Sequence, residues 1–306
     1  MSDLSDVHAT ELDDIQHTLP FAESIEADHA AQESLPGAGP AGKQRGSFLR
    51  EVVGPVVVFG LFLGFWYLAH YVLMGDQRRF LVPPPHRVLS EAVFDWDRFQ
   101  PILEGLWQST KVAAVGLAIA MVVGIALATV MSQASWIEKS VYPYLVALQA
   151  VPILAIVPLI GILFGFGFNS RVFVCVLIAL FPIVSSTLFG LLSADRLQHE
   201  LFTLQGVSRS TRLRKLQFPA AMPAIFTGFR ISAGLSVVGA IVGDFLFTQG
   251  DRGIGQLINL YRARLQTEEM FAALILACLL GVVVFWLFGF LSKIVVGKWY
   301  EPTRIT

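Results

Sequence analysis

A dense cationic segment separates two stretches of the chain that are apolar enough to cross a lipid bilayer. It reads ELFTLQGVSRSTRLRKLQFPAAMP over residues 200–223, and five Lys or Arg residues lie between positions 196 and 215. Charges at this density are too costly for a segment that faces lipid. The chemistry open to the segment is therefore electrostatic: recognition of a protein partner or adsorption to anionic lipid.

The order of residues in this segment predicts two short helices. The first would carry one apolar ridge, formed by Leu197, Leu201 and Leu204. Gly206 can adopt the left-handed backbone conformation that ends a helix, and Ser208 or Ser210 can cap the next one. We expect Pro219 to end the second helix and to begin the following apolar stretch.

The second helix would place apolar and charged side chains side by side. Leu213 and Leu216 would face one way, surrounded by Arg209, Arg212, Arg214 and Lys215. An apolar ridge with a collar of charges suits a docking element, because the ridge fills a groove and the charges fix the register. The same pattern also suits a basic amphipathic loop that lies on anionic lipid, so spacing alone leaves both interpretations open.

Two ionisable residues, Arg230 and Asp244, lie in the apolar stretch that follows. Each costs about 3 kcal/mol near the centre of a bilayer, so each should face a cavity or a partner. Fourteen residues of helix put them on roughly one face and about 21 Å apart, too far to pair with each other. They could line a translocation path. Alternatively, Arg230 could extend to an interface while Asp244 caps a helix end or pairs across subunits.

The elements that position these residues are predicted to be membrane-spanning helices. Stretches without Asp, Glu, Lys or Arg occupy residues 52–75, 112–137, 140–170, 172–194 and 270–292, and Arg230 alone interrupts 216–243. Each is long enough for a span, and in lipid only a helix satisfies the backbone of such a segment. We place six spans near 52–73, 112–133, 144–167, 172–193, 223–247 and 271–292. Pro152 and Pro158 should kink or break the third.

Composition excludes several classes of protein. The 306 residues are 55% hydrophobic and only 15% charged, with a mean hydropathy of +0.64. A net charge of −1 argues against a nucleic-acid partner. Cys175 and Cys278 lie apart in apolar stretches, and no Cys or His residues have metal-ligand spacing. With neither a Walker A motif nor a pattern for covalent catalysis, we predict no enzyme activity, no catalytic residue, no cofactor and no metal site.

The chain divides into a tail, a membrane domain and a short end. Residues 1–47 hold nine carboxylates and two cations, which predicts a disordered acidic tail. Residues 48–298 form the membrane domain, with the cationic loop at 195–219, and residues 299–306 form a C-terminal tail. With the N-terminus inside, inner segments carry twelve Lys or Arg and outer segments nine, which favours a multi-pass protein of the cell inner (plasma) membrane with both termini in the cytoplasm.

The cationic loop resembles the EAA motif of membrane subunits of ATP-binding-cassette (ABC) importers. Glu200, Gly206 and Pro219 match the Glu, Gly and Pro of that motif with its spacing. The two alanines of the motif are replaced by Leu201 and Phe202, and Phe218 stands in place of the leucine before the proline. The bulkier residues affect how the first coupling helix packs.

The resemblance extends over about residues 80 to 295. LVPPPHRVLSEAV is similar to the Leu-Pro-Ser-Pro segment of nitrate-, sulfonate- and taurine-type permeases. QAVPILAIVPLIGILFGFG is similar to their Pro-rich third span, and FPAAMPAIFTGFRISAGL, GIGQLI and TEEMFAALILACLLG match their later segments in the same order.

Membership in this family would imply an all-α, type I ABC importer permease fold with about six transmembrane helices. The subunit would work as a pair, most simply a homodimer, on cytoplasmic ABC ATPase subunits, and would receive solute from an extracellular or periplasmic binding protein. The expected contacts with the ATPase are Glu200, Leu201, Leu204, Gly206, Arg209 and Pro219. Small anions such as nitrate or bicarbonate and sulfonates such as taurine lead the candidate solutes, followed by thiamine pyrimidines and riboflavin.

Two other functions deserve comparison with an importer. A stand-alone secondary transporter or channel should show internal repeats and broken helices in pairs, and no convincing repeat is present. A membrane scaffold would explain the hydrophobicity but not the spacing of Glu200, Gly206 and Pro219.

Overall fold

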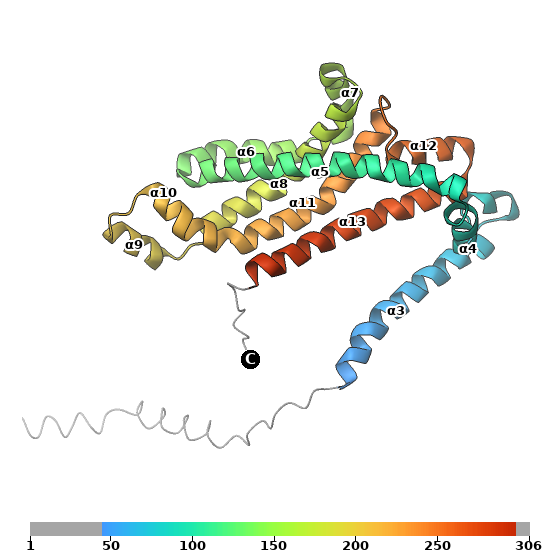
Figure 1. Ribbon diagram of the computed structural model, residues 1–306, viewed down its shortest axis with the longest axis horizontal. Helices are drawn as coiled ribbons and strands as arrows, with labels where there is room; N and C mark the ends of the chain where they lie inside the picture. The colour runs from blue at the N-terminus through green and yellow to red at the C-terminus, as the bar shows by residue number, and fades with distance from the viewer. Residues whose placement is uncertain (1–44, 298–306) are drawn as a thin grey trace, which may run out of the picture. The chain divides into compact units, whose positions relative to one another are not determined.

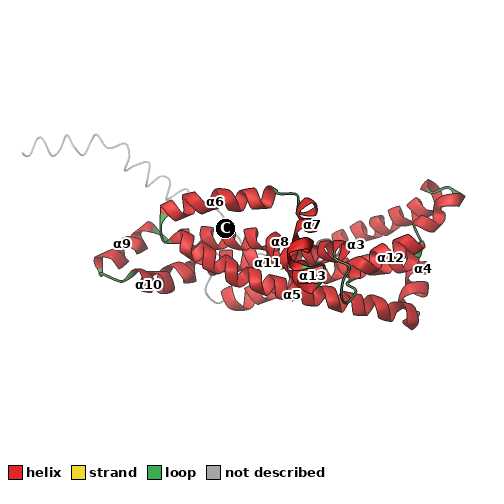
Figure 2. Ribbon diagram, turned by 90° about the horizontal axis from the view of Figure 1, so that it is seen from above, coloured by secondary structure: helices red, strands yellow, loops and turns green. Residues whose placement is uncertain are grey.

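The computed structural model describes residues 45–297, with side chains from residue 53 onward. Helices and loops, and no strands, make up this part of the chain (Figure 2). Contacts divide the chain into two units, Met1–Phe62 and Leu63–Thr306. Helix α3 (Arg45–Leu68) begins in the first unit and ends in the second. The acidic tail predicted for residues 1–47, apart from its last three residues, and the tail predicted for 299–306 lie outside the described residues.

The second unit is a succession of helices joined by short turns. After α3 come two short turns of π- and 3₁₀-helix, η1 (Ala69–Leu73) and η2 (Asp76–Leu81), then α4 (Pro85–Arg87) and η3 (Val88–Val93). The longer helices that follow are α5 (Trp96–Ser132), α6 (Ser135–Ala150), α7 (Ile153–Phe164), α8 (Phe168–Leu192), α11 (Phe218–Leu246), α12 (Ile254–Arg264) and α13 (Thr267–Val296). Between α8 and α11 lie α9 (Arg196–Leu204), α10 (Arg209–Arg212) and the π-helical turn η4 (Leu213–Gln217).

Four of these helices, α5, α8, α11 and α13, run side by side and form the core of the unit (Figure 1). Small residues allow the closest approaches. A Cβ on Gly116 of α5 would lie 2.5 Å from Cys175 Sγ of α8, and one on Gly239 of α11 would lie 2.9 Å from Cys175 Cα. Cys175 is therefore a small packing residue between two helices, as its apolar sequence context predicts.

Within residues 45–297, five helices are long and apolar enough to cross a membrane, and the count becomes six if α6 and α7 together form one span. These two helices meet at an angle of 99°. The predicted break at Pro152 is confirmed, since α6 ends at Ala150 and α7 begins at Ile153. Pro158 lies within α7 and does not interrupt it. Its missing N–H costs α7 the hydrogen bond to the Leu154 carbonyl, yet the helix continues to Phe164.

The second predicted span, residues 112–133, is the distal part of a longer helix. Helix α5 begins at Trp96, where the Asp95 carboxylate accepts the Asp97 N–H at 3.2 Å. Gln100 donates to Glu104, four residues on, at 2.9 Å. A cap and a polar pair thus extend the helix before the apolar stretch begins, and hydropathy by itself does not report this polar portion.

The ends of the four-helix core differ in what they carry. The hairpin end holds the C-terminus of α8, the segment α9–α10 and the N-terminus of α11 (Figure 1). The opposite end holds the N-terminus of α8, the C-terminus of α11 and the whole of α12.

Candidate functional site

The cationic segment forms the predicted pair of short helices. Asp195 caps α9 by accepting the Leu197 N–H at 3.1 Å, and Ser208 caps α10 by accepting the Thr211 N–H at 3.3 Å. Between them Gly206 has φ +64°, the left-handed conformation expected for it. The predicted cap at Ser208 and the predicted turn at Gly206 are therefore confirmed, whereas the cap at Asp195 was not predicted. We call residues 195–212 the hairpin.

The apolar ridge of α9 points away from the chain. The side chains that form it are exposed by 72%, 53% and 87% for Leu197, Leu201 and Leu204 respectively. Three leucines on one face of a nine-residue helix form a small apolar surface that the described part of the chain leaves uncovered. Such a surface is suited to filling a groove in a partner.

Polar contacts fix the two arms of the hairpin to each other. Arg212 of α10 donates from Nη2 to Thr203 Oγ1 of α9 at 2.8 Å. On α9 itself, Arg196 Nε lies 3.0 Å from Glu200 Oε1, an exposed pair one helical turn apart. Arg209 at the start of α10 is exposed and is available to a partner. The ridge is thus presented by a folded element rather than by a free loop.

The second half of the segment differs from its prediction. Leu216 is buried, and Leu213 packs against the core cluster that includes Leu191 of α8 and Ala221 of α11, so neither leucine forms an exposed face. Pro219 was expected to end the preceding helix, and this was wrong. The chain continues as helix from Arg209 to Leu246. Pro219 lies in the first turn of α11, after the wider turn η4, where its missing N–H interrupts little.

Arg230 lies on the exposed side of α11, against α13. Its guanidinium carbon is 4.0 Å from the centre of the Phe285 ring, a cation–π contact. Gly289, one turn further along α13, leaves room for the same side chain, because a Cβ there would lie 3.3 Å from Arg230 Nε. The structure therefore gives this intramembrane cation an aromatic partner.

Asp244 is fully buried near the opposite end, together with two residues that the sequence did not single out. Its carboxylate accepts a hydrogen bond from the hydroxyl of Ser109 on α5 and lies 3.3 Å from Nη1 of Arg171 on α8. Arg171 is one of the nine Lys or Arg residues that the sequence analysis assigned to outer segments. Its position at the edge of an apolar stretch indicates that it needs a partner, but nothing in the sequence identifies that partner.

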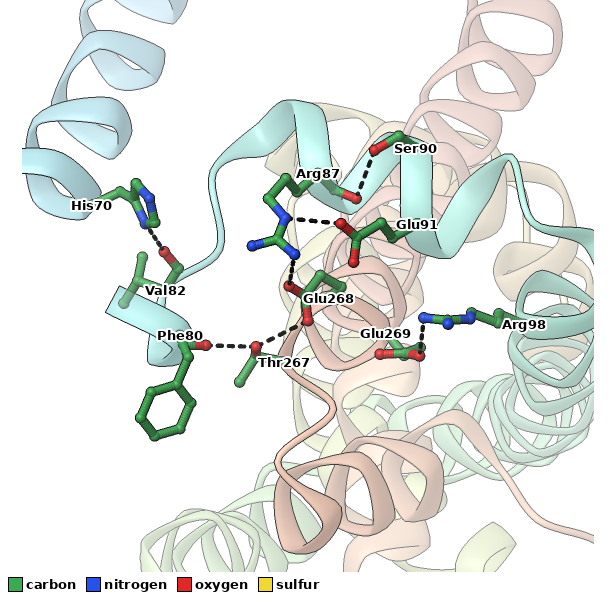
Figure 3. Close-up of polar contacts among 10 residues, drawn as sticks. All are labelled: His70, Phe80, Val82, Arg87, Ser90, Glu91, Arg98, Thr267, Glu268 and Glu269. Atoms are coloured by element: carbon green, nitrogen blue, oxygen red, sulfur yellow. Dashed lines mark hydrogen bonds and ion pairs between the residues drawn. The ribbon is translucent and has the colours of Figure 1, made fainter. Parts of the chain in front are cut away.

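A second polar group at the opposite end joins the start of α13 to the segment that follows α3 (Figure 3). Arg98 Nη1 is 3.1 Å from the buried carboxylate of Glu269, and Thr267 donates to the carbonyl of Phe80 at 2.6 Å. Arg87 contacts Glu91 at 2.8 Å and Glu268 at 3.7 Å. The Glu91 carboxylate raises the pKa of Arg87. These contacts place two acidic residues at a helix N-terminus, where the helix dipole favours them.

The described residues contain no group of three or more His, Cys, Asp or Glu side chains that could hold a metal ion. The described residues offer three candidate functional features: an exposed hairpin at one end, a buried ion pair at the opposite end and four closely packed helices between them.

Comparison with known proteins identifies the family. Residues 120–297 match the model of the binding-protein-dependent transport system inner membrane component. This match includes the hairpin, the whole of α8, α11 and α13, and the C-terminal part of α5. The chain belongs to this family.

Individual relatives of the permease extend the match over most of its length. It is 30% identical to the formylaminopyrimidine transport permease protein ThiX of Halalkalibacterium halodurans, over 77% of this chain and 91% of the relative. It is 31% identical to the riboflavin transport system permease protein RibX of Chloroflexus aurantiacus, over 88% of this chain and 98% of the relative. A nitrate import permease, NrtB of Synechocystis, is 31% identical over 62% of this chain and 69% of the relative.

Solved structures support the fold of the permease. A chain of the MetNI methionine ABC transporter in an inward-facing conformation superposes with a TM-score of 0.57 at 16% identity, over 67% of this chain and 99% of the other. A chain of an amino acid ABC transporter gives a TM-score of 0.52, also at 16% identity, over 68% of this chain and 98% of the other. The all-α ABC importer permease fold expected from the sequence is confirmed.

Family membership confirms the general class of function. The permease is a multi-pass inner-membrane transport component, and its family consists of transport permease subunits rather than enzymes. Binding-protein-dependent import implies an ATPase and a solute-binding protein as partners of the family.

Proposed function

We propose that this permease forms the translocation path of an ABC importer and couples it to ATP hydrolysis through the hairpin. The exposed leucine ridge of α9 is the observation that carries the proposal. The hairpin is capped at both helices and cross-linked by Arg212, so a force applied to the ridge is transmitted to α8 and α11, which it connects. Lipid adsorption needs neither the capped turn nor the cross-link.

The proposal includes an orientation and a second copy. The hairpin end faces the cytoplasm, where ATP is available, and both termini lie on that side. Glu200, Leu201, Leu204, Gly206, Arg209 and Pro219 are the proposed coupling residues, with Pro219 acting through the base of the hairpin rather than through the ridge. Two copies of the permease would enclose one path above two ATPase subunits, and a solute-binding protein would deliver solute at the opposite end.

For the solute we propose a heterocyclic nutrient of the formylaminopyrimidine or riboflavin kind, ahead of nitrate and sulfonates. The relatives named for the first two solutes are 30% and 31% identical over 77% and 88% of this chain. The nitrate relative named above is 31% identical over 62%, and another nitrate permease, of Leptolyngbya laminosa, is 27% identical over 82%. Uptake of riboflavin, formylaminopyrimidine, nitrate and taurine by cells with and without the permease tests this order.

Replacing Leu204 with aspartate should reduce ATPase co-purification at least tenfold and stop uptake. Leu204 is 87% exposed, so the change leaves the fold of the chain intact but puts a charge where an apolar groove would close over it. The matched control is His199→Asp, which adds the same charge to the opposite face of α9 and should retain the ATPase. Uptake that continues without any ATPase subunit would show a secondary carrier instead.

We also propose that Arg230 contributes a positive charge to the translocation path, the function that the sequence suggested for Arg230 and Asp244 together. Arg230→Ala should lower the maximal uptake rate several-fold while ATPase co-purification stays normal, because the charge would face the passing solute. Arg230→Lys keeps the charge over Phe285 and should retain most of the rate. Normal uptake by the alanine variant would remove Arg230 from the path.

A further inference from the structure

The connection between α11 and α12, residues 247–253, lies over a buried polar cluster at the opposite end. Three helices contribute to the cluster: α5 provides Ser109, α8 provides Arg171 and α11 provides Asp244. Ser109 and Asp244 are completely buried, and Arg171 is 3% exposed. Charged groups are rarely buried so completely unless each is compensated, so the contacts of the cluster show what it does.

The first task of the cluster is to compensate the charge of Asp244. The Ser109 hydroxyl donates to one carboxylate oxygen, and Arg171 Nη1 lies 3.3 Å from the other. The Ser109 oxygen also accepts the N–H of Ile254 at 2.8 Å. The first amide of α12 is thereby tied to α5 and, through Ser109, to the carboxylate on α11.

The second task falls to the guanidinium of Arg171. It donates to the carbonyls of three alternate residues of the connection: from Nη2 to Phe247 at 3.0 Å and to Gln249 at 2.8 Å, and from Nη1 to Asp251 at 2.9 Å. The planar guanidinium offers several donors in fixed directions, which a lysine ammonium does not. The connection is further tied to the segment before α8, because the Gln249 N–H donates to the Phe166 carbonyl at 3.0 Å.

Two neighbouring contacts complete the enclosure. Gln108 on α5 donates to the Asp251 carboxylate at 3.0 Å. On α11, Gly243 lets the backbone of Arg171 approach closely, since a Cβ there would lie 3.1 Å from Arg171 Cα. Arg171 therefore holds the connection through its backbone carbonyls, and Gln108 holds it through the Asp251 side chain.

We propose that Arg171 is a positioning residue: by neutralising Asp244 and holding residues 247–253, it makes the adjoining ends of α5, α8, α11 and α12 move as one body during transport. Asp244 serves this cluster rather than the solute, because no part of its side chain is exposed. Movement between the inward-open and outward-open states would then occur at other contacts, and the hairpin would drive the whole body. The cluster lies at the end of the molecule opposite the proposed ATPase contact.

The decisive variant is Arg171→Lys. It keeps the positive charge beside Asp244, but its single nitrogen has three N–H donors, whereas the two Nη atoms of Arg171 contact three carbonyls and the Asp244 carboxylate. The permease is purified with its ATPase subunits, and amide hydrogen exchange is followed in peptides that cover residues 247–253. We expect exchange there to be at least tenfold faster than in the unchanged chain, while exchange in the middle of α5, α8 and α11 stays the same. ATP hydrolysis by the complex in liposomes should fall several-fold.

Folding is checked separately in a Cys278→Ser background, where the buried Cys175 reacts with a maleimide only when the core opens. Arg171→Met should lower the temperature at which Cys175 reacts, because Asp244 loses its counter-charge. The double variant Arg171→Met with Asp244→Asn removes both charges and should recover much of that temperature while exchange at 247–253 stays fast. The matched control Arg78→Lys changes an exposed arginine at the same end and should alter neither measurement.

Two results would overturn the inference. Unchanged exchange at residues 247–253 in Arg171→Lys would show that the carbonyl contacts do not hold the connection. Faster exchange with unchanged ATP hydrolysis would show that holding it is irrelevant to transport. Co-purification of the ATPase is a separate measurement, and its loss in the unchanged chain would contradict the proposed function without bearing on Arg171.

Discussion

Gly206→Val should abolish stable association with the ATPase while leaving the membrane-embedded core folded. Gly206 has φ +64°. Its N–H donates to the Thr203 carbonyl at 3.0 Å, and the N–H of Val207 donates to the Phe202 carbonyl at 3.2 Å. A β-branched residue is strained in this conformation by about 2 kcal/mol or more. The turn can relieve that strain only by opening, and the contact between Arg212 and Thr203 would then be lost.

The measurement is co-purification of the ATPase with the permease, which we expect to fall at least tenfold. Asparagine tolerates the left-handed conformation, so Gly206→Asn is the matched control and should retain the ATPase. The reaction temperature of Cys175 should be the same in both variants, because the hairpin lies outside the core. Full association in the valine variant would mean that the turn does not present the ridge, and the proposed coupling would lose its structural basis.

Gly253→Ala should be the most destabilising small substitution at the opposite end. A Cβ on Gly253 would lie 2.0 Å from Asp244 Oδ2 and 2.2 Å from its Cγ. The carboxylate cannot move aside, because Ser109 and Arg171 hold it from two sides. Overpacking of this kind costs about 3 kcal/mol. We expect much less folded protein in the membrane and a reaction temperature of Cys175 several degrees lower.

The backbone at Gly253 suits any residue, with φ −82° and ψ 170°, so strain of the main chain does not contribute. Gly167→Ala is the matched control: this glycine also precedes a helix at the opposite end, and its added Cβ would meet nothing within 4 Å. It should behave as the unchanged chain does. If Gly253→Ala reacted at the normal temperature, the close packing of α12 on Asp244 would be refuted.

The two ends of the permease thus differ in whether their key side chains are exposed or buried. At the hairpin end, an apolar ridge is left exposed and held by few contacts, which suits a surface that a partner must reach. At the opposite end, charged groups are buried and fully enclosed. A glycine is required at each end, at Gly206 for its backbone conformation and at Gly253 for the space beside a carboxylate.

The amino-acid sequence determined what depends on neighbours along the chain. Apolar stretches set the membrane helices, Pro152 set the break before α7, and the order of Glu200, Gly206 and Pro219 identified the hairpin and the family. Each of these signals acts over a few residues of backbone: hydrogen bonds within a helix, a fixed φ at proline, a left-handed turn at glycine. These local signals can therefore be recognised in the sequence without knowledge of which helices pack together.

Only the tertiary structure decided which residues far apart in the chain meet. The leucines Leu213 and Leu216, predicted to share a face among exposed cations, both pack inward: Leu216 is buried, and Leu213 lies against the cluster of Leu191 and Ala221. Pro152 marks the break between α6 and α7, but the 99° angle at which they meet could not be read from the sequence. The pairing of Arg171 with Asp244 depends on α8 and α11 crossing closely at their ends. Burial and ion pairing are properties of positions in space, and a charge in an apolar stretch shows that a partner must exist but not which residue it is.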